Sequence, residues 1–178
     1  GTVKFERVVV TDGLDGGPGG AGIRTAAGSN VTLLESRVTA NLVSLGGSGG
    51  GGGIRSLGTL VVDRSTIDAN RAGTAGGGGI LTVGATTITN STITGNIATS
   101  GSGLRANGAA VVTITHSTIS HNTSGAGIHV AGSVTAQSSI VSDHGSGNCS
   151  AASPNTRLTR RPRCTAGRAA MVAVQRCR

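Results

Sequence analysis

Seven carboxylates could carry acid–base chemistry or hold a cation: Glu6, Asp12, Asp15, Glu35, Asp63, Asp68 and Asp143. Glycosidic bond cleavage needs two carboxylates close enough to act as acid and base. In an alignment of the chain on its internal repeats, Glu6 and Asp63 share a column with Leu34 between them, so they lie about 9–10 Å apart. Asp12 and Asp143 share another column, in the first and the last of the stacked repeats. No pair converges, and we predict no catalytic residue in this chain.

The segment Asp12-Gly13-Leu14-Asp15-Gly16-Gly17 has two interpretations. Gly-Asp turns bind Ca²⁺ when successive repeats stack several copies of the motif. Here the motif occurs once, which favours an ordinary turn. The four histidines fall in different columns without the spacing of metal ligands; they are His116, His121, His129 and His144. We therefore predict no metal site and no cofactor.

One column of the alignment is basic. The residue that follows a recurrent aliphatic is, in successive repeats, Arg24, Arg55, Leu81, Arg105 and His129. We expect these residues on the outer face of one sheet, as a discontinuous basic stripe. Guanidinium groups recognise carboxylates and phosphates through paired hydrogen bonds, so an anionic polysaccharide is a candidate partner. The alternative is an ordinary solvated face.

The columns come from a repeat that ends in Asn. Asn41, Asn70, Asn96 and Asn122 are followed in the same register by His144, at spacings of 29, 26, 26 and 22 residues. From residue 20 onward, each repeat begins with a glycine run and one aliphatic residue. A repeat of this length without a helical period predicts a solenoid.

Alternation along each strand predicts the residues that point into the solenoid, with a Ser at the bend between two short strands. In chain order the six sets are Val3, Phe5, Val8 and Val10; Val31, Leu33, Ser36, Val38 and Asn41; Leu60, Val62, Ser65, Ile67 and Asn70; Thr86, Ile88, Ser91, Ile93 and Asn96; Val112, Ile114, Ser117, Ile119 and Asn122; and Val134, Ala136, Ser139, Val141 and His144.

Composition supports the same fold. The 178 residues include 32 Gly and one Phe, with no Trp and no Tyr. A core of Val, Ile, Leu and Ala beside Thr and Ser favours strands, and the glycine runs interrupt helices. We predict an all-β, right-handed parallel β-helix of about six coils with three short strands per coil.

The Asn residues have a structural explanation. Asn tolerates the left-handed backbone conformation, and stacked amides can bond one another in a ladder. We therefore interpret Asn41, Asn70, Asn96 and Asn122 as a structural ladder. On the outer surface of the solenoid, we expect Arg7, Glu35 and Arg64 to stack on successive coils with alternating charge.

Several units resemble a known family. They are Gly-Gly-Gly-Ile (51–54 and 77–80), Gly-Ala-Gly-Ile (20–23 and 125–128), Ser-Thr-Ile-Asp-Ala-Asn (65–70), Ser-Thr-Ile-Thr-Gly-Asn (91–96) and Ser-Thr-Ile-Ser-His-Asn (117–122). Together they resemble the right-handed parallel β-helix repeats of secreted and surface-anchored bacterial proteins, and are similar to chlamydial polymorphic outer-membrane protein repeats. The resemblance covers about residues 2–150. It implies an architecture that serves adhesins, lyases and hydrolases alike.

The C-terminal segment differs from the repeats. Residues 1–150 hold eight Lys/Arg and seven Asp/Glu, whereas residues 151–178 hold seven Arg and no acidic residue, within a net charge of +8. We predict a β-helix domain over 1–150 and a basic tail over 151–178 that is disordered, forms a capping helix or is out of frame. Cys149, Cys164 and Cys177 allow one disulfide of unspecified pairing.

These observations predict a class of function. No apolar stretch is long enough to span a membrane, and the near-neutral repeats, with Phe5 as their single aromatic residue, argue against nucleic-acid binding. We expect a non-enzymatic segment of a longer extracellular or cell-surface protein, with a structural or adhesive role. It would contact an anionic polysaccharide or cell-surface glycan along one sheet. The alternative is a non-catalytic fragment of a polysaccharide lyase or glycoside hydrolase.

Overall fold

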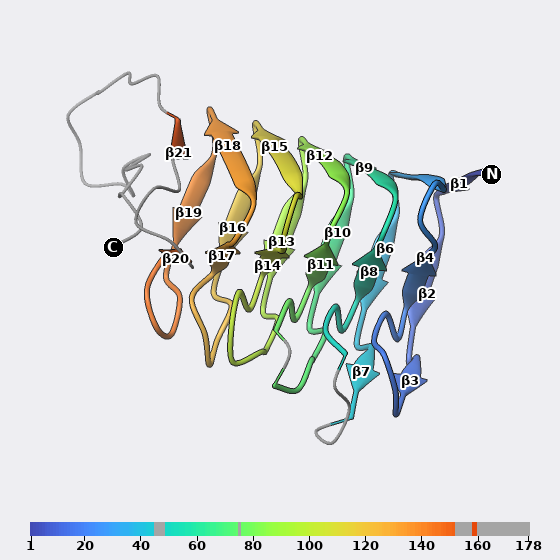
Figure 1. The fold of residues 1–178 in the computed structure, drawn as a ribbon, viewed down its shortest axis with the longest axis horizontal. Coiled ribbons are helices and arrows are strands. Elements are labelled where there is room, and N and C mark those ends of the chain that lie inside the picture. The colour runs from blue at the N-terminus through green and yellow to red at the C-terminus, as the bar shows by residue number, and fades with distance from the viewer. Residues whose placement is uncertain (45–48, 75, 152–157, 160–178) are drawn as a thin grey trace.

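The computed structural model describes residues 1–44, 49–74, 76–151 and 158–159. These residues form only strands, bends and turns, wound into a solenoid whose coils lie side by side along one axis (Figure 1). Within this part of the chain, no helix is long and apolar enough to cross a membrane. The predicted all-β parallel solenoid is confirmed.

The first sheet contains the longest strands. Among the described residues it has seven strands, six of five residues and one of two, all paired in parallel with their neighbours. In spatial order they are β1 (Thr2–Glu6), β5 (Asn30–Leu34), β9 (Thr59–Asp63), β12 (Ala85–Thr89), β15 (Val111–Thr115), β18 (Ser133–Gln137) and β21 (Leu158–Thr159).

Two further sheets of six parallel strands complete the walls. The second sheet holds β2 (Val9–Thr11), β6 (Arg37–Thr39), β10 (Thr66–Asp68), β13 (Thr92–Thr94), β16 (Thr118–Ser120) and β19 (Ile140–Ser142). The third holds β4 (Ile23–Thr25), β8 (Ile54–Ser56), β11 (Ile80–Thr82), β14 (Leu104–Ala106), β17 (Ile128–Val130) and β20 (Cys149–Ala151). Each of coils two to six therefore contains one strand of each sheet, entered through the third, and β1 and β2 form coil one.

A short fourth ladder follows the Asn residues, and sequence reasoning missed it. Strand β3 (Leu14–Asp15) pairs with β7 (Leu42–Val43), and single parallel bridges continue the row from Leu42 through Arg71 and Ile97 to Thr123.

The predicted register is confirmed by the interior files. Ile67 stacks between Val38 and Ile93, Ile93 stacks on Ile119, and all of these side chains are fully buried. Coil one fits the same register, since Phe5 stacks on Leu33 and Val10 on Val38. Val3 stacks on Val31 but is 49% exposed, because β1 pairs with β5 on one side only.

Two corners of each coil use a left-handed residue, at φ between 46° and 63°. One corner precedes the buried Ser, or Val8 in coil one, and contains Arg7, Glu35, Arg64, Asn90, His116 and Ser138. The other precedes Gly13 in coil one, the Asn in coils two to five and His144 in coil six, and contains Asp12, Ala40, Ala69, Gly95, His121 and Asp143. The expectation that the Asn residues themselves adopt this conformation was wrong. The residue before each Asn turns the chain, which leaves the amide pointing inward.

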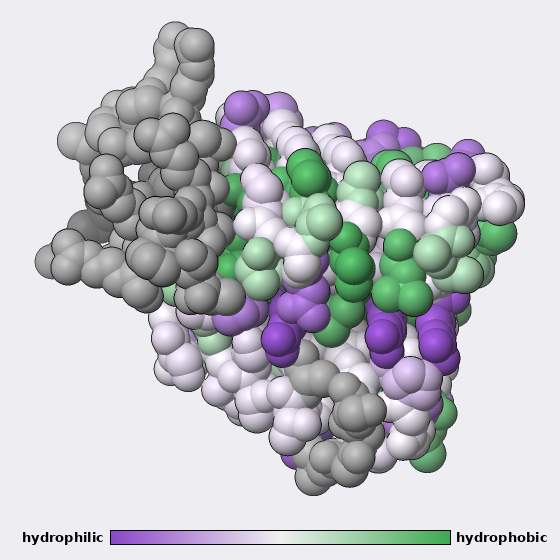
Figure 2. Space-filling model, viewed as in Figure 1, coloured by the Kyte–Doolittle hydropathy of each residue, from purple (hydrophilic) through white to green (hydrophobic). Residues whose placement is uncertain are grey.

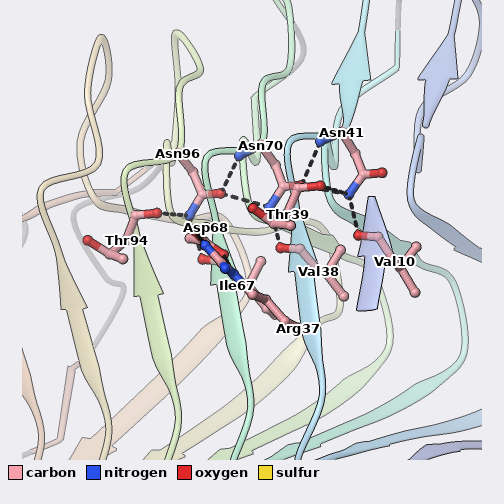
Figure 3. A network of polar contacts seen from close by, with 10 residues as sticks. All are labelled: Val10, Arg37, Val38, Thr39, Asn41, Ile67, Asp68, Asn70, Thr94 and Asn96. Carbon is pink, nitrogen blue, oxygen red and sulfur yellow. Dashed lines mark hydrogen bonds and ion pairs between the residues drawn. The ribbon is translucent and has the colours of Figure 1, made fainter. Parts of the chain in front are cut away.

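The inward amides form a ladder along the solenoid (Figure 3). Asn70 Oδ1 accepts both the backbone N–H and the side-chain amide of Asn41, at 3.1 and 2.9 Å. Asn96 accepts the same two bonds from Asn70, and Asn122 accepts them from Asn96. Because these residues are buried, the ladder supplies partners for polar groups that would otherwise be costly to enclose.

The buried serines form a second ladder, which the sequence did not reveal. Ser65 Oγ accepts the backbone N–H of Ser36 at 3.0 Å and donates to the carbonyl of Asp63 at 2.8 Å. Ser91, Ser117 and Ser139 repeat both contacts in the following coils. A hydroxyl both donates and accepts, so one small side chain secures each bend.

The glycine before each aliphatic residue makes room for the Asn ladder. A Cβ placed on Gly53 would lie 2.9 Å from Asn70 Nδ2, and one on Gly79 would lie 3.1 Å from Asn96 Nδ2 and 2.6 Å from the carbonyl oxygen of Gly103. The Gly-aliphatic and Asn motifs of the sequence are therefore two halves of one packing arrangement.

Candidate functional site

The basic stripe lies on the third sheet. Arg24, Arg55, Leu81, Arg105 and His129 occupy the central position of β4, β8, β11, β14 and β17, and each pairs in register with the next. Ile or Leu on one side of this position, and Thr, Ser, Ala or Val on the other, point into the core, so the central residue points outward. The five residues therefore form one file parallel to the solenoid axis.

Exposure varies along the stripe. Arg24 is exposed, and Arg55, Arg105 and His129 are partly exposed. Leu81 is only 5% exposed although it faces outward. Hydrophilic patches form a row along this face in Figure 2, with hydrophobic surface between them. The apolar side chain of Leu81 thus divides the stripe. Arg24 and Arg55 lie on one side of it, and Arg105 and His129, which is cationic when protonated, lie on the other.

Glycine turns border the stripe on one side, which explains the burial of Leu81. A Cβ on Gly77 would lie 2.8 Å from Leu81 Cβ, and one on Gly50 would lie 2.6 Å from Leu81 Cδ1. Gly51 and Gly77 adopt φ of 74° and 68°, and the N–H groups of Gly51 and Gly52 donate to Gly76 and Gly77 of the next turn. These stacked turns hold the aliphatic parts of the stripe against backbone.

Hydrogen bonds orient the far end of the stripe. Arg105 Nε donates to Asn107 Oδ1 at 2.8 Å, and His129 Nδ1 lies 2.9 Å from Ser150 Oγ. Burial lowers the pKa of His129, and the positive charge of Arg105 lowers it further. At neutral pH the permanent cations of this face are therefore Arg24, Arg55 and Arg105.

The guanidinium group of Arg55 has a different environment from that of Arg105. Its Nε is buried and has no hydrogen-bond partner within the described part of the chain. A buried guanidinium N–H without an acceptor costs free energy.

The carboxylates lie elsewhere and mostly form ion pairs. Arg37 Nε contacts Asp68 Oδ1 at 2.8 Å, beside the Asn ladder (Figure 3), and Arg64 contacts both Glu35 and Asp63, at 3.1 and 2.8 Å. The hydrogen bond from Arg37 lowers the pKa of Asp68, although partial burial opposes it. Glu6 pairs with Lys4, and that hydrogen bond lowers the pKa of Glu6.

Glu6 and Asp63 occupy the positions predicted for them, on either side of Leu34 in the first sheet. Asp15 accepts N–H bonds from Gly17 at 2.8 Å and Gly19 at 2.6 Å, so its carboxylate serves a turn. Among residues 1–44, 49–74, 76–151 and 158–159, no group of three or more His, Cys, Asp or Glu could hold a metal ion. Cys149 is disulfide-bonded.

The C-terminal predictions fall largely outside the described residues. Cys164 and Cys177 lie there, as does most of the predicted tail with its alternative of a capping helix. Strands β20 and β21 extend the third and first sheets, and they pair with β17 and β18. The boundary after residue 150 stays a prediction.

Comparison with known families agrees with the architecture. The family model described as a right-handed beta helix region matches residues 1–142, and the chain belongs to this family. The handedness predicted from the sequence is that of the family. Searches of curated proteins and of solved structures found no match.

Proposed function

We propose that this chain is a non-catalytic β-helix segment of a secreted or cell-surface protein, which binds an anionic glycan along the third sheet. The observation that carries the proposal is the file of Arg24, Arg55 and Arg105 on successive or alternate strands, with His129 beside Arg105. Strands of one sheet lie about 4.8 Å apart, so the file presents charges at regular intervals along a straight line. A linear polymer with repeated carboxylates or sulfates is complementary to such a line.

The rigidity of the face supports the proposal. The stripe rests on the stacked glycine turns and on a core of fully buried Ile54, Ile80 and Leu104. A pre-organised array loses little conformational freedom on binding, which favours extended ligands. The resemblance to surface-protein repeats supports an adhesive or structural role, and a location outside the cell belongs to the same proposal.

Binding to a polyuronate tests the proposal. Affinity electrophoresis in gels containing polygalacturonate should retard the protein, whereas gels containing neutral dextran should not. The double variant Arg55→Ala/Arg105→Ala should weaken binding by about tenfold or more, which is about 1.4 kcal/mol or more. Raising the salt concentration should weaken binding of the unchanged protein.

The matched control removes two charges elsewhere. Arg7 and Arg71 are exposed and lie outside the stripe, so Arg7→Ala/Arg71→Ala lowers the net charge equally. Equal losses in the two double variants would indicate nonspecific charge attraction and would overturn the proposal. Release of unsaturated or reducing ends during incubation would instead support the alternative, a piece of a polysaccharide-degrading enzyme.

A further inference from the structure

The Asn ladder ends on a histidine. In each coil from three to five, the Asn Oδ1 accepts two bonds from the preceding Asn. At the end of coil six the acceptor is His144 Nδ1, which lies 3.2 Å from the backbone nitrogen of Asn122. One hydrogen bond thus replaces two at the last rung.

We propose that His144 is an acid-sensitive latch, which holds the turn after β19 onto coil five while its ring is neutral and releases the turn when the ring takes up a proton.

The direction of the hydrogen bond determines how the latch works. The backbone N–H of Asn122 can only donate, so Nδ1 must present its lone pair and the neutral ring carries its proton on Nε2. Protonation of Nδ1 would place an N–H against an N–H. The contact that closes the ladder would become a repulsion.

The ring has little room to rearrange. His144 Nε2 is buried and has no hydrogen-bond partner among the residues that the structure describes. The ring also lies directly against Gly127, where any Cβ would collide with it. A charged ring would lose the contact with the Asn122 N–H while Nε2 stays enclosed, which favours movement of the ring toward solvent together with its turn.

Neighbouring charges do not reverse this preference. Among the described residues, Asp143 beside the ring and His121 of the preceding coil are the titratable groups that affect it. Burial lowers the pKa of His144, and the charge of His121 lowers it further. Hydrogen bonding with the backbone of Asn122 and Ile119 and the charge of Asp143 raise it, but the net shift of the pKa is downward. The folded state therefore favours the neutral ring, and the latch is closed at neutral pH.

The turn controlled by the latch leads to the last strand of the third sheet. Gly145 N donates to the carbonyl of Asn122 at 3.2 Å, and Gly127 N donates to the carbonyl of Gly147 at 3.0 Å. Residues 149–151 then form β20 on the edge of β17. Release of the turn would loosen β20 and expose the edge of β17, which is a surface for adding another strand.

Hydrogen exchange measured by mass spectrometry tests the latch. Protection factors, corrected for intrinsic exchange, should be compared at about pH 7.5 and about pH 5, on either side of the histidine range. Peptides that cover 143–151 should lose protection in acid, by up to about tenfold for each pH unit that separates the pKa of free histidine from that of His144. Peptides over β11 and β12 should keep their protection.

Two variants make the result decisive. His144→Asn supplies the side chain found at this position in the four preceding coils and should remove the acid-induced loss. His121→Asn removes one exposed histidine nearby and should leave the loss unchanged. The proposal fails if 143–151 keeps full protection in acid, or if His144→Asn responds to acid like the unchanged protein. If His144→Asn does not fold, ring ¹⁵N shifts of His144 give the tautomer directly, and a protonated Nδ1 at neutral pH would also overturn the proposal.

Discussion

The interior files and the outer stripe of this solenoid follow opposite rules. Inside, the same residue recurs at each rung, as in the Asn ladder and the Ser ladder. On the outer face of the third sheet the file varies between Arg, Leu and His. In these two ladders each polar side chain both donates and accepts, so one deviation affects two rungs. The outer file accommodates different residues in successive coils, so these variable positions are the ones able to specify a partner.

The largest effect is expected when one methyl group is added to the packed interior of the solenoid. Gly79→Ala places a Cβ 2.6 Å from a backbone oxygen and should destabilise the protein by about 3 kcal/mol, the upper range for overpacking. Gly95→Ala is the matched control. Its Cβ would meet nothing closer than 3.8 Å, and Ala40 and Ala69 already occupy the same left-handed corner. Chemical denaturation of both variants checks the prediction, which fails if the two midpoints shift equally.

Removing one amide from the ladder should have the next largest effect. Asn96→Ala leaves the buried N–H and Nδ2 of Asn70 without their acceptor, and should cost about 2–3 kcal/mol. Asn90→Ser changes an exposed Asn to the residue found at Ser138 in the same corner, and should cost under about 0.5 kcal/mol. Urea denaturation distinguishes them; a similar small cost for both would mean that the ladder contributes little to stability.

The interior rules explain why so much of the fold could be predicted from the sequence. Ser, Asn and the aliphatic residues recur because each rung needs them, and their alignment predicted the pairing of Ile67 with Ile93 and Ile119. The left-handed residue before each Asn was not predicted, because Ala40 and Ala69 carry no sequence signal for that conformation. The Gly–Asn packing depends on the path of the turn in space, although the joint recurrence of the two motifs was a usable signal.

The candidate site was less predictable. Pairing placed Arg24, Arg55, Leu81, Arg105 and His129 in one file, as the alignment indicated. Sequence alternation could not show that the glycine turn covers Leu81, because the covering atoms belong to backbone. Nor could it show which of the cations are exposed.

A cation added to the basic stripe tests whether the outer file specifies a partner. Leu81→Arg supplies the missing cation between Arg55 and Arg105, which occupy equivalent positions beside equivalent glycine turns. We expect binding to polygalacturonate to strengthen by about threefold, roughly 0.7 kcal/mol, with little change in stability. Val83→Arg adds the same charge outside the file, on a residue that is 37% exposed, and should improve binding less. Equal gains would show that the file has no special role.

The smallest expected effect concerns the ion pair of Arg37 and Asp68 on the outer surface, which, like the interior ladders, is held by hydrogen bonds. Arg37 donates to Asp68 through Nε at 2.8 Å and through a second nitrogen, and this hydrogen bonding lowers the pKa of Asp68 from its ordinary value of 3.8. A carboxyl whose pKa is lower in the folded state contributes stability above the unfolded pKa, and that contribution disappears as the pH falls through the folded value.

Asp68→Asn should therefore reduce the free energy of unfolding at neutral pH, by less than about 1 kcal/mol because Arg37 is largely exposed. The difference from the unchanged protein should begin to shrink near pH 3.8 and vanish once the pH is below the lower pKa of folded Asp68, and Arg37→Gln should show the same pH dependence. A difference that persists in strong acid would mean that Asp68 acts through packing rather than through its charge.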